Sequence, residues 1–313
     1  MDGQRIARQE ALADLLVLTG LCLLGMVVFS AAGLYLVSVF TGLEAMELAD
    51  LSNPDESNPQ LRTAVLILQG TIAAGSFILL PSLMRYFRPS ALTPPGVKSS
   101  TTMLLLITGL GLLMLPVNAL LAAWNQSIHL PGFLQGMQSW AWDKEKEMER
   151  LTSFLVDFSG PSESLLGFAV IALMAGISEE FFFRKLLQPR LITLTGNPHA
   201  GIWLTAFIFS AIHIQFFGLI PRMALGALFG YYYFWTGNIG LSMFAHAFNN
   251  GITLLGLVLY QQKVSPLNVE DPSEIPWYLG GIAAGLVWSL SGMVQEEAIK
   301  IRRILKQKQA AAA

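Results

Sequence analysis

Eight stretches of this sequence are apolar over a length that can cross a lipid bilayer, and this feature constrains the fold most. A helix needs about 20 predominantly apolar residues to span the hydrocarbon core. Hydrophobic residues make up 53% of the 313 residues and charged residues 13%, far from soluble usage. The sequence therefore predicts an all-α polytopic membrane protein with about eight transmembrane helices in one bundle. The stretches cover residues 12–41, 62–86, 101–124, 163–190, 198–217, 220–236, 239–262 and 276–295.

The charges between these stretches predict how the chain is oriented. By the positive-inside rule, connections rich in Lys and Arg face the cytoplasm. Both termini are therefore expected to be cytoplasmic, as an even number of spans requires. One set of connections is basic, with Arg5, Arg8, Arg85, Arg88, Lys98, Lys185, Arg190, Lys300, Arg302, Arg303, Lys306 and Lys308. The alternate set is acidic, with Glu44, Glu47, Asp50, Asp55, Glu56, Glu270, Asp271 and Glu274.

Three charged residues, Glu179, Glu180 and Arg184, lie inside the fourth apolar stretch. A charged side chain at bilayer depth costs at least ~2.5–3.5 kcal/mol, so the three need compensation or a use. Glu180 and Arg184 are four residues apart on one helix face and are expected to form a structural ion pair. Glu179 is rotated by about 100° from Glu180 and points elsewhere. Glu179 is therefore the candidate for chemistry.

Two of the four histidines, His213 and His246, also lie inside apolar stretches. His246 and Asn250 are four residues apart, so they share a helix face and can address one substrate atom. Asn249 falls on another face and is interpreted as a packing or polar-network residue. A single intramembrane histidine is often a packing residue, but these groups on neighbouring spans indicate a common polar site.

Two chemistries fit these residues, and their spacing does not separate them. In the first, Glu179 and His213 hold a water and Glu179 takes its proton, while His246 and Asn250 donate to the oxyanion. In the second, Glu179, His213 and His246 bind Zn²⁺, which activates the water. The amide of Asn250 slightly favours the metal-free form, because it is a poor zinc ligand and a good donor. The non-catalytic alternative is a polar network for helix packing or an ion path.

The combination Glu179-Glu180-x-x-x-Arg184, Phe209-x-x-x-His213 and His246-x-x-x-Asn250 resembles the motif set of the CPBP family. These are the type II CAAX prenyl endopeptidases and related bacteriocin-processing enzymes. The resemblance covers the fourth to the seventh span and implies an eight-helix intramembrane endopeptidase. It implies that Glu179 and His213 activate water, that His246 and Asn250 are the oxyanion partners, and that Glu180 and Arg184 are the structural pair.

The resemblance leads to a functional hypothesis with an alternative. We expect an intramembrane endopeptidase that hydrolyses a membrane-associated protein or peptide, in CAAX-type or leader-type processing. The alternative is a non-catalytic scaffold, immunity protein or transporter that uses the same polar site. The partners are the substrate and the bilayer. Nucleic acid is not expected, because no basic cluster is interleaved with aromatic residues.

Three regions are expected along the chain. Residues 1–158 form a three-span region with a connecting segment, 159–262 the CPBP-like catalytic core, and 263–313 the last span with a basic cytoplasmic tail. Segment 134–158 is charged in its middle and apolar at its ends. It is expected either to lie in the membrane interface and cover a cavity mouth or to be a solvated helical connection.

Depth is a tension in this interpretation. A rise of ~1.5 Å per residue from the span ends places Glu179 nearer the cytoplasmic side and His213 nearer the other side. A shared site requires the two residues to meet at one depth.

Overall fold

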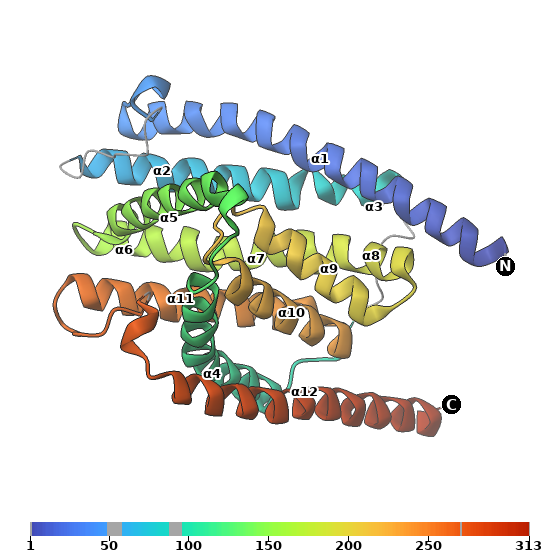
Figure 1. Ribbon diagram of the computed structural model, residues 1–313. Helices are drawn as coiled ribbons and strands as arrows, with labels where there is room; N and C mark the ends of the chain where they lie inside the picture. Colours follow the sequence, from blue (N-terminus) through green and yellow to red (C-terminus); the bar gives the residue numbers. More distant parts are fainter. Residues whose placement is uncertain (1, 49–57, 88–95, 270, 313) are drawn as a thin grey trace.

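The computed structural model describes residues 2–48, 58–87, 96–269 and 271–312, which form a bundle of helices (Figure 1). No strand occurs among these residues. The prediction of an all-α polytopic membrane protein is confirmed. Several of the charges used to predict orientation lie outside the described residues, namely Asp50, Asp55, Glu56, Arg88 and Glu270.

Within the described ranges, six helices are long and apolar enough to cross a membrane. Two of them are built from shorter pieces that continue one another. They are α1 (Asp2–Thr41), α2 (Pro59–Ala73) continued to α3 (Met84–Phe87), α4 (Thr101–Gln126), α6 (Pro161–Gly167) continued through α7 (Ala175–Glu180) to α8 (Gln188–Thr195), α11 (Ile239–Gln261) and α12 (Trp277–Ala312).

The expected spans over 198–217 and 220–236 are shorter helices. α9 (Pro198–Ala211) has 14 residues and α10 (Leu219–Thr236) has 18. Fourteen residues rise about 21 Å, which is less than the ~30 Å of a bilayer core. Figure 1 shows the loop between α9 and α10 about midway along the bundle. These two helices therefore form a hairpin whose tip lies partway along the bundle.

Side chains on neighbouring helices hold this tip in place. The amide of Asn125 on α4 donates to the Phe216 carbonyl at 3.0 Å and accepts from the Ile220 N–H at 3.2 Å. The Ser210 hydroxyl donates to the Leu219 carbonyl at 2.7 Å. Buried polar groups need such partners, so a loop inside the bundle is satisfied by its neighbours.

Both termini lie at one end of the bundle, with α1 and α12 along opposite edges and the central helices between them (Figure 1). Helix α5 (Gln135–Val156) lies along the half of the bundle away from the termini, where it contacts α2, α6 and α11. The segment 134–158 is therefore one helix packed on the bundle. The loop between α11 and α12 lies at this same end.

The helix that carries the charged motif is irregular on both sides of α7. Wider π-type turns occupy Phe168–Met174 and Phe181–Leu187. Such turns are frequent at functional sites, because they rotate the residues that follow.

Gly176 sets the distance between α7 and α11. A Cβ atom at this position would lie 2.6 Å from the Ala247 backbone nitrogen and 2.8 Å from its Cα. Only glycine permits this approach, as is usual where transmembrane helices pack closely. Ala247 follows His246, so this contact brings His246 against the glutamates of α7.

Candidate active site in the helix bundle

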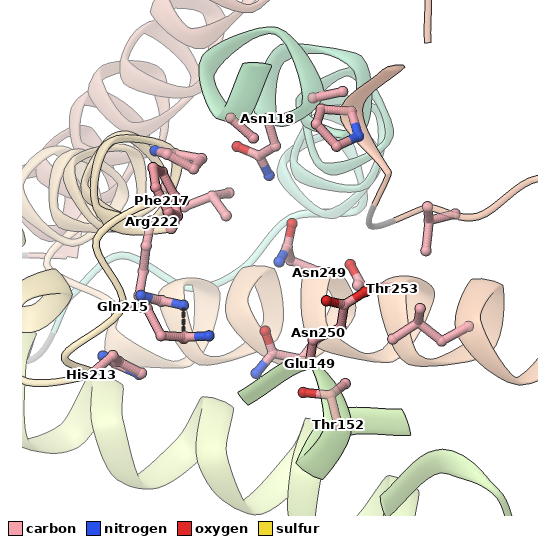
Figure 2. A pocket seen from close by; sticks show the side chains of 18 of the residues that line it. Asn118, Glu149, Thr152, His213, Gln215, Phe217, Arg222, Asn249, Asn250 and Thr253 are labelled. Carbon is pink, nitrogen blue, oxygen red and sulfur yellow. Dashed lines mark hydrogen bonds between the residues drawn. The ribbon is translucent and has the colours of Figure 1, made fainter. Parts of the chain in front are cut away.

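A cavity of about 640 Å³ opens inside the bundle. Its walls come from α4, α5, α7, the α9–α10 hairpin, α11 and the loop after α11. Figure 2 shows Asn249, Asn250 and Thr253 along α11, with His213 and Arg222 opposite them. Glu179 and His246 also line this cavity. The structure therefore brings the four expected catalytic side chains, Glu179, His213, His246 and Asn250, to one space.

Glu180 and Arg184 form a fully buried ion pair. The Arg184 Nε atom lies 3.1 Å from Glu180 Oε2, and both side chains are 0% exposed. Arg184 Nη2 donates to the Gly226 carbonyl at 3.2 Å, and its guanidinium carbon lies 4.5 Å from the centroid of the Phe209 ring. A cation against an aromatic face is favourable, more so away from water. The motif's own helix thus supplies the counter-ion, as its spacing predicts.

His246 connects the two glutamates. Its Nδ1 lies 2.8 Å from Glu180 Oε1, and its Nε2 lies 3.7 Å from Glu179 Oε2. Because the Glu180 carboxylate is paired with Arg184, it accepts and Nδ1 donates, which fixes the ring orientation and turns Nε2 toward Glu179. The ring stacks on Phe229 with centroids 5.1 Å apart. Glu180 therefore orients His246 as well as pairing with Arg184, which the spacing within one helix does not reveal.

His213 presents one nitrogen to the cavity. Its Nδ1 lies 2.8 Å from the Phe209 carbonyl, an acceptor only, so Nδ1 carries the proton and Nε2 has a free lone pair. Within the described ranges no hydrogen bond joins Glu179 to His213. Each is free to bind a molecule in the cavity.

The depth tension disappears in the folded chain. His213 lies in the tip of the α9–α10 hairpin, two residues after α9 ends at Ala211. Because α9 ends about midway along the bundle, His213 does not reach the far side (Figure 1). It lines the same cavity as Glu179.

The two asparagines of α11 both face the cavity. Asn250 Nδ2 donates to the Ile171 carbonyl at 3.3 Å, which leaves its second N–H for another acceptor. Asn249 is 7% exposed, and its Oδ1 has no hydrogen-bond partner among the described residues. Asn249, interpreted from the sequence as a packing or polar-network residue, also lines the cavity.

Three cavity residues were missed in the sequence, Arg222, Asn118 and Glu145. Arg222 lies on α10, where its Nη2 donates to Gln215 Oε1 at 2.5 Å (Figure 2). Its charge also interacts with that of Glu145 on α5. Arg222 and Asn118 fall inside expected spans, and a polar residue there is functional by default, so this rule could have found both. Burial raises the pKa of Glu145, and the Arg222 charge opposes the rise.

A zinc site from Glu179, His213 and His246 does not assemble. Among the residues that the structure describes, no group of three His, Cys, Asp or Glu side chains could hold a metal ion. Glu179 and His246 are close enough to be two ligands, but His246 Nδ1 is committed to Glu180, so only its Nε2 faces the cavity. A catalytic zinc site needs three protein ligands.

Comparison with known proteins places the same residues in a family. The model of the family described as type II CAAX prenyl endopeptidase Rce1-like matches residues 161–252. This part of the chain thus resembles that family, which confirms the resemblance seen in the motifs. All of the site residues from Glu179 to Asn250 lie within the matched region.

A curated relative matches a shorter stretch. The chain is 32% identical over 80 residues to the uncharacterized protein YpbD of Bacillus subtilis (strain 168), which covers 24% of this chain and 38% of the relative. The match thus spans less than half of the relative's length. No solved structure matches the chain.

Proposed function

We propose that this protein is an intramembrane endopeptidase that hydrolyses a peptide bond of a membrane-associated protein or peptide with water activated by Glu179 and His213. One observation carries the proposal. A histidine oriented by a buried, ion-paired glutamate faces a second glutamate on the wall of a polar cavity. The family of the matched region, which is named for CAAX prenyl endopeptidases, supports the same class of reaction.

The proposed reaction begins with a water molecule between Glu179 and His213 Nε2. Glu179 takes a proton from the water as its oxygen attacks the carbonyl carbon of the scissile bond. The carbonyl π electrons move to the oxygen and form a tetrahedral oxyanion. Glu179 then gives the proton to the leaving nitrogen as the C–N bond breaks, so protons and electrons balance.

The oxyanion is stabilised by His246 and Asn250. His246 donates through Nε2–H, with Nδ1–H held by Glu180, and Asn250 donates through the N–H not used by Ile171. With His246 doubly protonated, the charges of Glu179, Glu180, Arg184 and His246 sum to zero. A neutral cluster avoids the penalty of a net charge at low dielectric. One preorganised donor of this kind contributes roughly 10²–10³ in turnover.

The test is cleavage of a defined mixture of synthetic peptides by purified protein in detergent. We expect product termini in mass spectra with the wild type and a loss of roughly 10²–10⁴ in turnover with Glu179→Gln. The matched control is Asp14→Asn, because Asp14 pairs with Arg190 away from the cavity. Its turnover per folded molecule should be unchanged. Equal cleavage by wild type and Glu179→Gln would rule out Glu179 as the base, and no cleavage by either would support the non-catalytic alternative.

Metal dependence is tested on the same material. If the chain's own side chains activate water, protein dialysed against chelator should remain active, with no stoichiometric metal by elemental analysis. One tightly held zinc per active chain, lost together with activity in His246→Ala, would overturn metal-free activation.

A further inference from the structure

The cavity has a direction along the bundle. On α11 its lining begins at His246, about a third of the way along the helix, and continues to Gln261 at the helix end. From His246 to Tyr260 the helix rises about 21 Å. The lining continues onto Asn268 and Asp271 in the loop that follows. The cavity therefore runs from mid-bundle to the end of the bundle where α11 finishes.

That end lies opposite the termini. Helix α12 starts at the α11–α12 loop and runs the length of the bundle to the C-terminus. The N-terminus lies at the same end of the bundle as the C-terminus (Figure 1). On α4 the cavity-lining residues run from Leu115 to Gln126, the half of the helix nearer its C-terminal end. The lining residues of α4 and α11 thus both indicate that the cavity opens at the end of the bundle opposite the termini.

The two ends of the bundle differ in charge. The described connections and tails at the terminus end carry ten bases, namely Arg5, Arg8, Arg85, Lys98, Lys185, Arg190, Lys300, Arg302, Arg303 and Lys306, against the acids Glu10, Asp14, Glu296 and Glu297. Arg190 pairs with Asp14 and Lys300 with Glu297. The opposite end carries the acids Glu44, Glu47, Asp157, Glu163, Asp271 and Glu274, with Lys263 as an exposed base. Helix α5 adds four acids and three bases, and Arg62 is buried against carboxylates.

We propose that the cavity opens to the extracytoplasmic side of the membrane, so that the substrate is a polypeptide segment exposed on that side. The positive-inside rule places the basic end, with both termini, in the cytoplasm. The cavity end then faces outward. That the segment is a substrate rests on the proposed function, whereas the direction in which the cavity opens does not depend on catalysis.

The chemistry of the outer wall defines the class of segment. Where it approaches the end of the bundle it is mixed, with Gln126, Thr152, Ser153, Gln261 and Asn268 beside Val156, Leu257, Tyr260 and Val269. The polar side chains can bond the backbone of an extended peptide, and the apolar ones can contact its side chains. The predicted substrate is thus an exported or looped-out polypeptide segment, because the cavity opens on the side away from the cytoplasm.

Cysteine labelling in intact cells tests the direction. The single cysteine, Cys22, is buried and is first replaced by alanine. Single cysteines are then placed at Ser273 in the α11–α12 loop, at Thr253 on the cavity wall and at Ser99 at the terminus end. We expect a membrane-impermeant maleimide to label Ser273→Cys and Thr253→Cys in intact cells. Ser99→Cys should react only after the cells are permeabilised.

Two outcomes would overturn the proposal. Labelling of Ser99→Cys alone in intact cells would place the cavity end in the cytoplasm. Labelling of Ser273→Cys without Thr253→Cys would show that the cavity is closed from outside. Neither result depends on turnover. If labelling follows the expectation while purified protein cleaves none of the synthetic peptides, the direction stands and the proposed hydrolysis fails.

Discussion

Arg184 lies in the middle of the bundle and Arg62 near the start of α2 at the end away from the termini, and both side chains are buried, at 0% and 2% exposed. Each faces carboxylates and an aromatic ring, with Phe209 against Arg184 and Phe154 against Arg62. The two clusters face the same difficulty, which is a guanidinium group out of water.

The clusters differ in how completely they satisfy that group. Arg62 Nε donates to the Phe154 carbonyl at 2.6 Å, Nη1 lies 3.1 Å from both Glu163 oxygens, and Nη2 lies 3.5 Å from Asp157. Every nitrogen has a partner, and the contacts join α2 to the end of α5 and to α6. This saturated cluster is suited to a structural role.

The Arg184 cluster is not saturated. The Nε–Glu180 contact is short, but its geometry is not that of a hydrogen bond, and Nη1 has no partner among the described residues. Glu180 instead accepts a hydrogen bond from His246 Nδ1. The comparison shows that a buried arginine–carboxylate pair can serve stability in one cluster and function in another. The functional cluster leaves its arginine incompletely bonded and holds a histidine toward the cavity.

The largest expected effect comes from removing the less satisfied arginine. Arg184→Ala leaves Glu180 buried without a counter-ion, which should lower the free energy of unfolding by about 3–5 kcal/mol. Denaturation in detergent followed by circular dichroism measures it. Arg184→Lys keeps the charge but loses the planar guanidinium group, so its free energy of unfolding should lie between those of the wild type and Arg184→Ala. Wild-type stability in Arg184→Ala would contradict the assignment of Arg184 as the essential counter-ion.

The next effect separates function from stability in the same cluster. His246→Ala should slow turnover by roughly 10²–10³, because one oxyanion donor is lost. The control is His199→Ala, because His199 is exposed and its Nδ1 lies 2.7 Å from the Tyr231 hydroxyl, away from the cavity. Steady-state kinetics on folded protein should show a change in His246→Ala alone. A similar loss in both variants would point to a general folding defect.

A smaller effect is expected from the saturated cluster. Arg62→Met leaves Glu163, 10% exposed, without its partner, while Asp157 is 70% exposed and remains hydrated. The free energy of unfolding should fall by about 1–3 kcal/mol, the usual cost of an unpaired buried polar group. Adding Glu163→Gln should recover part of it. Turnover should be retained. A loss of turnover larger than that of His246→Ala would contradict the structural role of the Arg62 cluster.

The smallest effect concerns Glu145 on α5, the helix whose C-terminal end is bonded by Arg62. Burial raises its pKa from the ordinary value of 4.5. Below that value both the folded and unfolded chains hold the proton. As pH rises, the unfolded chain loses the proton first, so stability falls until pH passes the folded pKa. Unfolding at several pH values should show this fall in the wild type and not in Glu145→Gln. Arg222→Gln should steepen it.

The sequence predicts relations within one helix well. The four-residue spacing of Glu180 and Arg184 predicts an ion pair, and that of His246 and Asn250 predicts a shared face, because helix geometry fixes both. The apolar stretches predict the membrane class for a similar reason, since length and composition are local properties.

Relations between helices were decided only by the tertiary structure. Glu180 and His246 are 66 residues apart, and their contact depends on the approach of α7 to α11 at Gly176. The depth of His213 depends on α9 ending inside the bundle, where Asn125 and Ser210 satisfy the hairpin tip. The role of α5 as a cavity wall is tertiary too. The sequence by itself determined the residue types and their faces, because these follow from backbone geometry along one helix. Only packing decided which faces meet, because it depends on close contacts between residues far apart in the chain.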